Sequence, residues 1–100
     1  MKVFLDDVRE CPEGWLLAKT AKEAIFYLIT LGITEISLDH DLGTEDTGYT
    51  VAEYIERGAY EKTLPRLTWH LHTDNPVGRA KMQAALTRAD KYWSENEKNP

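Results

Sequence analysis

The residues of this chain that are best suited to chemistry gather in SLDHDLG, from Ser37 to Gly43. Asp39, His40 and Asp41 are consecutive there and directly follow an apolar run. Neighbouring carboxylates repel each other and shift each other's pKa values, so a purely structural role explains this cluster poorly. A bound cation, a proton-transfer task or both explain it better. A second acidic pair, at residues 6–7, also follows an apolar run, and two acidic strand ends in one small chain predict one shared site.

Asp6 and Asp7 carry oxygen ligands that suit a hard divalent cation. Magnesium is typically held by one or two carboxylates together with water and phosphate oxygens. An isolated aspartate pair is equally typical of a loop cap in which one carboxylate pairs with Arg9. Asp39 favours the cation site, because the fold would place it beside the other two. We therefore expect these three aspartates to bind a divalent metal, Mg²⁺ or Mn²⁺.

The three histidines are candidates for proton transfer. An unperturbed histidine titrates near neutrality, which makes His40 a candidate for general acid–base work; the alternative is a supporting histidine that donates to a carboxylate. His70 and His72 lie two residues apart and therefore on one face of a strand. We expect His72, at the strand end, to be catalytic and His70 to support the sheet. Asp41 would orient a histidine, and which histidine is acid and which is base stays open.

The stretch from Asn75 to Arg79 predicts a seat for a phosphate group. Pro76 fits the first position of a helix, where its missing N–H is not needed. Gly78 leaves backbone N–H groups open to close approach. The helix dipole favours an anion there, and Arg79 adds a full charge. The alternative is an ordinary helix cap with Arg79 on the surface.

The elements that must position these residues alternate along the chain. We expect strands at residues 2–6, 15–19, 35–38 and 67–72, with helices at residues 20–32, 50–57 and from residue 76 onward. Thr20 and Glu23 form a capping pattern, and Gly32 and Gly58 are expected to end the first two helices. This alternation predicts an α/β fold with a mostly parallel sheet. Ligands bind outside the carboxyl ends of such strands, where every suspicious residue lies.

One connection does not fit the simple pattern. The segment between the first two strands is too short for a full crossover helix, since parallel neighbours need a dozen or more residues. Either a helix has been lost there, or the second strand is paired in another way.

Length and charge set further limits. A chain of 100 residues predicts one domain, at residues 1–93, followed by a polar tail at residues 94–100. The net charge of −5 argues against binding of duplex DNA but allows a small anionic ligand. Cys11 is the one cysteine, so no internal disulfide and no zinc spacing is expected. No secretory signal and no apolar stretch of membrane length is found, so we expect no membrane association and a cytoplasmic location.

The motifs LDDVR, CPEGW, SLDHDLG, TGY and HTDNPVGRAKM occur in this order and together resemble the cyclic-phosphate-processing receiver domains. These are a derived branch of the response-regulator receiver fold, and the similarity runs from residue 3 to about residue 90. The resemblance implies a small three-layer, flavodoxin-like α/β fold with a four-stranded sheet, truncated relative to ordinary receivers. It places Asp6, Asp7 and Asp39 in the receiver's acidic pocket. Thr73 takes the position of the receiver's hydroxyl residue, which we count among the expected phosphate-binding residues with Asn75, Gly78 and Arg79.

The resemblance also implies an activity. His40, Asp41 and His72 are the family's additions to the receiver site, and they underlie its predicted action on cyclic phosphates. The fifth strand of ordinary receivers, with the lysine that helps to hold an acyl phosphate, is not found in this sequence. We therefore predict a metal-dependent phosphoesterase that acts on a cyclic nucleotide or on a 2′,3′-cyclic phosphate RNA end. The alternatives are a degenerate receiver that serves as phosphoacceptor or binds a protein partner, and a noncatalytic binder of cyclic nucleotides.

Overall fold

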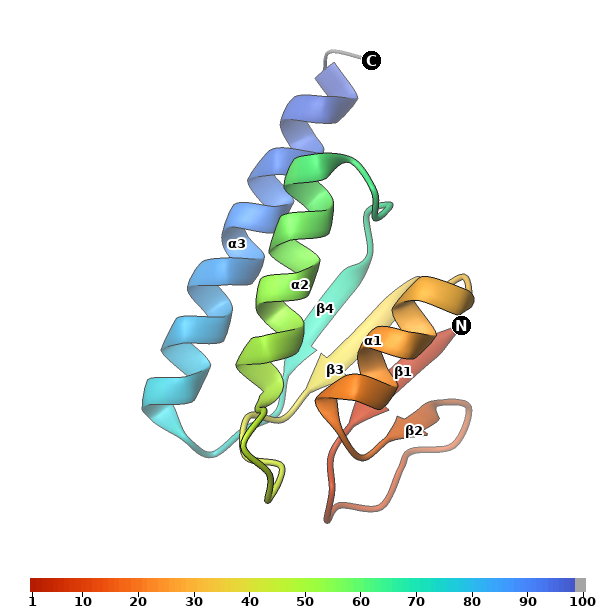
Figure 1. Cartoon of the computed structure of the whole chain (residues 1–100), viewed down its shortest axis with the longest axis vertical. Coiled ribbons are helices and arrows are strands. Elements are labelled where there is room, and N and C mark those ends of the chain that lie inside the picture. The colour runs from red at the N-terminus through yellow and green to blue at the C-terminus, as the bar shows by residue number, and fades with distance from the viewer. Residues whose placement is uncertain (99–100) are drawn as a thin grey trace.

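A computed structural model describes residues 1–98 of the chain. Strands and helices alternate in it, in the order β1 (Lys2–Leu5), β2 (Leu16–Ala18), α1 (Ala21–Thr30), β3 (Glu35–Leu38), α2 (Gly48–Glu61), β4 (Thr68–Leu71) and α3 (Pro76–Lys98). The four strands form one parallel sheet in the spatial order β2-β1-β3-β4 (Figure 1). The predicted α/β fold with a parallel four-stranded sheet is confirmed.

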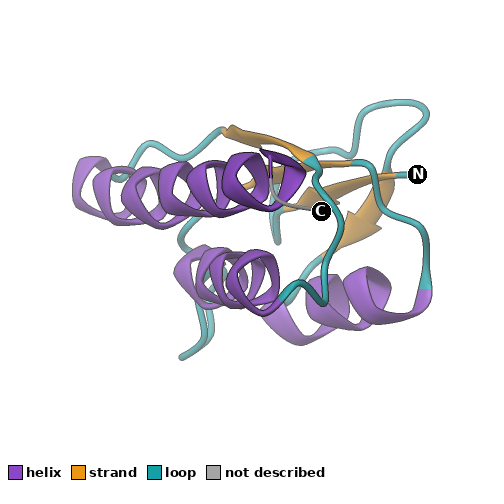
Figure 2. Ribbon diagram, turned by 90° about the horizontal axis from the view of Figure 1, so that it is seen from above, coloured by secondary structure: helices purple, strands orange, loops and turns teal. Residues whose placement is uncertain are grey.

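The three described helices lie on one face of the sheet, and α2 contacts both α1 and α3 (Figure 2). Val3 and Leu5 of β1 and Ile36 and Leu38 of β3 point to this face and are buried in one core with residues of all three helices. Within residues 1–98 the molecule therefore has two layers, and it lacks the second helical layer of the expected three-layer arrangement.

The handedness of the connections explains this. The connections from β2 to β3 and from β3 to β4 cross the sheet in the same direction, so right-handed crossovers place their helices on the same face. The connection from β1 to β2 runs the other way and would place a helix on the opposite face, but residues 6–15 contain no helix. Since β2 nevertheless pairs with β1 in parallel, the first of the two alternatives for this connection, a lost helix, holds.

Aromatic rings cover part of the face that has no helices. The register aligns Phe4 with Ser37 and Ser37 with His70, so these side chains share that face. Trp15, at the end of the β1–β2 connection, meets Phe4 edge to face with ring centroids 6.4 Å apart and lies 6.5 Å from the ring of His70. The ring of His72 stacks on Phe4 at 4.4 Å. Phe4 is thereby buried without a covering helix.

The first helix begins as predicted but ends differently. The Thr20 hydroxyl accepts the N–H of Glu23 at 3.1 Å, which confirms the capping residue. Gly32 is not the cap at the other end. That position belongs to Leu31, whose backbone is extended and whose N–H donates to the carbonyl of Tyr27.

The second helix is longer than the sequence pattern predicted. It begins at Gly48 rather than residue 50, and Gly58 lies inside it rather than ending it. A Cβ at position 58 would lie 2.7 Å from the Cβ of Leu64, so this glycine makes room for the chain that returns toward β4. The left-handed Lys62, with φ of 62°, ends the helix instead.

The third helix begins at Pro76, as predicted, and continues to Lys98. Residues 94–98, expected as a polar tail, are therefore helical, while residues 99–100 lie outside the described residues. Contacts to the preceding chain explain the extension, because Arg66 donates to Ser94 at 3.0 Å and to Glu97 at 2.9 Å. Among residues 1–98, no helix combines the length and the apolar character that crossing a membrane requires.

Candidate functional site

The carboxyl ends of β1, β3 and β4 meet at one edge of the sheet, the lower edge in Figure 1. An open hollow of about 440 Å³ lies there, lined by the segments that follow these strands. The lining residues are Asp6, Val8, Arg9, Asp39, Asp41, Thr73, Asp74, Asn75 and Pro76. The structure thus brings together predicted site residues from all three strand ends.

Asp6 is almost fully buried, with 1% of its surface exposed, and both oxygens of its carboxylate have hydrogen-bond partners. Its Oδ1 accepts the backbone N–H groups of Val8 and Arg9, each at 2.9 Å, and its Oδ2 lies 3.0 Å from Nε2 of His72. Burial alone would raise the pKa of Asp6, but the hydrogen bonds from Arg9, Val8 and His72 outweigh it and lower the pKa. The loop-cap alternative for this aspartate therefore holds alongside its place in an acidic cluster.

Asp6, Asp7 and Asp39 each offer one oxygen, and these oxygens lie within 4.8 Å of one another. Gly43, with φ of 68°, turns the β3–α2 loop toward this cluster, and a Cβ there would lie 3.1 Å from Oδ2 of Asp7. An all-carboxylate set of this size suits a hard divalent cation such as Mg²⁺. The predicted metal-binding residues are therefore neighbours whose donor chemistry fits the group.

Gly48 fixes the position of Asp39. Its N–H donates to the carbonyl of His40 at 2.9 Å, and a Cβ at this position would overlap the backbone carbonyl of Asp39. The first residue of α2 thus packs directly against the end of β3. This close approach is the physical reason for the glycine in the TGY motif.

His40 and Asp41 form a hydrogen-bonded pair. Nδ1 of His40 lies 2.9 Å from Oδ1 of Asp41, and the side-chain amide of Asn75 donates to Oδ2 of Asp41 at 3.3 Å. These hydrogen bonds, first from His40 and then from Asn75, lower the pKa of Asp41. Because Asp41 is an ionised acceptor, the neutral form of the His40 ring carries its proton on Nδ1, and in that form Nε2 has a free lone pair.

Nε2 of His40 has no hydrogen-bond partner within residues 1–98. In that part of the chain every fully buried polar side-chain atom has a partner, so this nitrogen is not fully buried. An imidazole that is oriented at one nitrogen and free at the other can accept a proton.

Gly78 and Arg79 were predicted to bind a phosphate, but in the structure both donate hydrogen bonds to other groups of the chain. The N–H of Gly78 donates to Oδ1 of Asn75 at 3.0 Å, which is the cap of α3. A Cβ at Gly78 would overlap the ring of His40, so the glycine seats that ring. Nη2 of Arg79 donates to the carbonyl of Leu71 at 3.0 Å, and Arg79 does not line the hollow. The N–H of Gly78 is therefore not free to bind an anion, and Arg79 lies outside the lining of the hollow.

Thr73 and Asn75 both line the hollow. The buried Thr73 accepts the N–H of Asn75 at 3.1 Å, which shapes the turn before α3. The Thr73 hydroxyl proton stays available as a donor.

His72 has both ring nitrogens occupied. Nε2 pairs with Asp6, while Nδ1 lies 2.7 Å from the hydroxyl of Ser37. Burial lowers the pKa of His72, against the opposing effect of Asp6, and so favours the neutral ring. Nε2–H then donates to the carboxylate, and Ser37 donates to Nδ1. This geometry favours His72 as a residue that positions Asp6 over one that carries protons.

Sequence reasoning missed two residues of this edge. The sequence pattern predicts Ser37 only as part of the third strand, although a hydroxyl in an otherwise apolar strand is a usable signal. Arg9 was considered only as a partner for an aspartate. In the structure its Nη2 also donates to Oδ2 of Asp74 at 3.1 Å, across the hollow. His70, expected to be a supporting residue, lies outside the hollow and 2.6 Å from Oε2 of Glu35.

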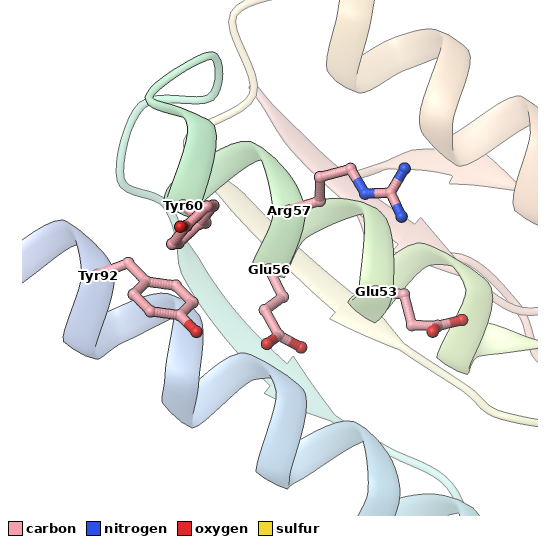
Figure 3. A pocket seen from close by; sticks show the side chains of 5 residues that line it. All are labelled: Glu53, Glu56, Arg57, Tyr60 and Tyr92. Atoms are coloured by element: carbon pink, nitrogen blue, oxygen red, sulfur yellow. The ribbon is translucent and has the colours of Figure 1, made fainter.

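A second hollow of about 340 Å³ lies on α2 and α3, away from the strand ends (Figure 3). It is lined by Glu53, Glu56, Arg57, Tyr60 and Tyr92. Glu56 is paired with Arg88 at 2.8 Å, and the two tyrosine rings pack against each other at 5.2 Å. None of the predicted site residues lines it, so the edge of the sheet is the better candidate.

Comparison with known proteins gives one match. The family model described as the cyclic-phosphate processing receiver domain matches residues 1–88. No curated protein and no solved structure matches the chain. The matched range contains all three strand ends that form the acidic hollow.

Proposed function

The chain belongs to the cyclic-phosphate processing receiver domain family, and from this premise we propose that it is a metal-dependent phosphoesterase that opens cyclic phosphates. One observation carries the proposal. A cluster of three carboxylates lies on the same edge of the sheet as a histidine that is oriented at Nδ1 and free at Nε2. Hydrolysis of a phosphodiester requires a cation site and a free base, and candidates for both lie at this edge, although His40 itself is not among the lining residues of the hollow.

Asp6, Asp7 and Asp39 would hold the divalent cation, Mg²⁺ or Mn²⁺. When bound, the cation would supply Lewis-acid polarisation of a phosphoryl oxygen. The chain contributes the placement of these ligands. Backbone donors hold Asp6, and the close approach of Gly48 holds the end of β3 at Asp39.

His40 would be the general base. Its Nε2 takes a proton from the attacking water as the new P–O bond forms, and the ring P–O bond breaks. The leaving ribose oxygen takes up a proton from solvent, which gives a phosphomonoester, and His40 returns its proton to solvent. Asp41 holds the ring in the required tautomer and stabilises its protonated form, as a carboxylate does for the histidine of a hydrolytic triad. A positioned base of this kind contributes about 10²- to 10⁴-fold in rate.

His72 would act through Asp6 rather than on the substrate. Its hydrogen bond fixes the direction of the Oδ2 lone pairs, and partners of this kind orient metal-binding carboxylates. This assignment separates two histidines that sequence reasoning treated as an acid and base pair.

The phosphoacceptor alternative has less support. Such a role needs Asp39 to accept a phosphoryl group, yet the family match is to cyclic-phosphate processing. Incubation with a small phosphodonor tests it, because stable labelling of Asp39 would favour signalling over hydrolysis.

The proposal is tested with a panel of 2′,3′- and 3′,5′-cyclic nucleotides and RNA with a 2′,3′-cyclic end, each with and without Mg²⁺ or Mn²⁺. We expect turnover of at least one member that depends on the metal and is lost in Asp39→Asn. Glu53→Gln removes an exposed carboxylate from the other hollow and is the matched control. Absence of turnover across the whole panel would overturn the proposal.

A further inference from the structure

Arg9 is the one cationic side chain among the residues that line the hollow at the strand ends. The other charged lining residues are aspartates, at positions 6, 39, 41 and 74. An anionic substrate that enters this hollow therefore meets a single fixed positive charge of the chain.

The backbone of Arg9 is anchored while its side chain stays accessible. Its N–H donates to Oδ1 of the buried Asp6 at 2.9 Å, and its Nε lies 3.8 Å from Oδ2 of the same residue. The side chain nevertheless exposes 47% of its surface. A guanidinium on an anchored stem loses less conformational entropy when it binds a ligand than a free surface arginine does.

The present partner of the guanidinium is easily replaced. Nη2 of Arg9 donates to Oδ2 of Asp74 at 3.1 Å, but Asp74 exposes 97% of its side chain. Exposed ion pairs contribute little to stability, whereas a phosphate offers a guanidinium two parallel hydrogen bonds. Replacing Asp74 by a phosphate therefore exchanges a weak partner of this guanidinium for one that can make two hydrogen bonds.

We propose that Arg9 receives the phosphate group of the substrate and that Asp74 is the counter-ion that this phosphate displaces. The inference rests on the proposed function. Among the expected phosphate contacts it replaces Gly78, whose N–H is engaged by Asn75, and Arg79, which does not line the hollow. The surrounding carboxylates repel an anion, so phosphate binds to Arg9 when a divalent cation occupies the acidic cluster.

The experiment is an NMR titration of the full chain with inorganic phosphate and, separately, with 2′,3′-cyclic AMP, both at saturating Mg²⁺. A preceding titration with Mg²⁺ alone reports metal binding. The arginine Nε–H resonances are the readout, together with the dissociation constant. Arg57→Gln, which removes an exposed arginine of α2, is the matched control, and circular dichroism verifies the fold of each variant.

We expect the Arg9 Nε–H resonance to move with each phosphate ligand. Arg9→Gln should weaken binding at least about tenfold, as expected for loss of a hydrogen bond to a charged group. Asp74→Asn should tighten binding about two- to fivefold, the size of an exposed ion pair. Arg57→Gln should bind like the wild type.

Two results would overturn the inference. One is an Arg9→Gln variant that folds and binds phosphate as tightly as the wild type, and the other is weaker binding in Asp74→Asn. The result is separable from the proposed function. Phosphate binding through Arg9 without turnover of any cyclic phosphate contradicts the proposed enzyme and supports this inference. Turnover that survives in Arg9→Gln, with unchanged affinity for phosphate, supports the proposed enzyme and contradicts this inference.

Discussion

The ring of His72 donates to the buried carboxylate of Asp6 across 3.0 Å, in a pair whose members lie 66 residues apart in the sequence. The hydroxyl of Ser37 occupies the other ring nitrogen at 2.7 Å. His40 and His72 therefore differ in kind: within residues 1–98, Nε2 of His40 has no hydrogen-bond partner, whereas both ring nitrogens of His72 have one.

This difference predicts a split between two variants. His72→Gln should raise the Mg²⁺ concentration needed for half-maximal turnover by about 10- to 100-fold, the usual cost of losing a partner that orients a metal ligand. The shape of its pH–rate profile should be unchanged. His40→Gln should lower kcat by about 10²- to 10⁴-fold at saturating Mg²⁺, with metal affinity nearly intact.

Steady-state kinetics at varied Mg²⁺ and pH measure both effects. The opposite pattern, with the profile altered by His72→Gln and metal affinity altered by His40→Gln, would show that the roles are reversed.

Acid should destabilise the metal-free protein through the same pair. Burial lowers the pKa of His72 in the folded state. Below about pH 6.5 the unfolded chain therefore binds a proton at this residue more readily than the folded chain does, and the free energy of unfolding falls. The pKa of Asp6 is also lowered in the folded state, so a further loss follows as pH falls below its ordinary range near 4. Both effects act in the same direction, because in each case the unfolded chain binds more protons.

Urea unfolding in the presence of a chelator at pH 7.5 and 5.5 isolates the upper part of this effect. The wild type should lose more free energy of unfolding than His72→Gln between these two values. A loss that is equal in the two proteins would mean that His72 titrates alike in the folded and unfolded states.

Gly48→Ala should be strongly destabilising. The added methyl group would overlap the carbonyl of Asp39, and α2 would have to move away from the end of β3. Overpacking of this kind costs about 1–3 kcal/mol, and each kcal/mol lowers Tm by about 4–8 °C in a chain of this size. Thermal unfolding measures it.

Gly32→Ala is the matched control, because a Cβ at position 32 meets no atom within 4 Å and the backbone there does not require a glycine. If Gly48→Ala and Gly32→Ala had the same Tm, α2 would not be held against Asp39 as described.

Turnover should depend little on the identity of the base. None of the residues that line the hollow is aromatic, so no lining side chain provides a ring on which a base could stack. Stacking on an aromatic side chain contributes about 1–3 kcal/mol per base, and its absence leaves the phosphate end as the recognised feature. The kcat/KM values for the 2′,3′-cyclic phosphates of adenosine, guanosine, cytidine and uridine should therefore agree within about threefold. A factor of ten corresponds to 1.4 kcal/mol, so threefold is about 0.7 kcal/mol, less than one stacking contact contributes. A preference above tenfold would point to a base contact outside this hollow.

The sequence was informative where chemistry follows from backbone periodicity. The apolar run that ends before Asp39 gave the bounds of β3, at Glu35–Leu38, correctly. The alternation of elements placed the two acidic strand ends on one edge, because parallel strands share their direction. The cap at Thr20 was also legible, since its partner lies three residues away.

What spacing alone could not show is which donors are already used. Gly78 reads as an open amide in sequence, but Asn75 accepts its N–H and the ring of His40 fills the space above it. Arg79 resembles a phosphate ligand in the sequence, but in the structure its Nη2 donates to the carbonyl of Leu71. Gly58 resembles a helix end in the sequence. The actual reason for this glycine is Leu64, which packs against it after the chain has turned back, and the local pattern does not show that contact.

The most direct test of the proposed phosphoesterase is ³¹P NMR of 2′,3′-cyclic AMP incubated with the protein and Mg²⁺. The account predicts that the cyclic phosphate resonance is replaced by that of a single phosphomonoester. It also predicts that chelation of the metal abolishes the conversion and that Asp39→Asn and His40→Gln each slow it by at least about a hundredfold, as loss of a positioned base does. An unchanged cyclic resonance with the wild type, or conversion that continues at the wild-type rate in both variants, would contradict it.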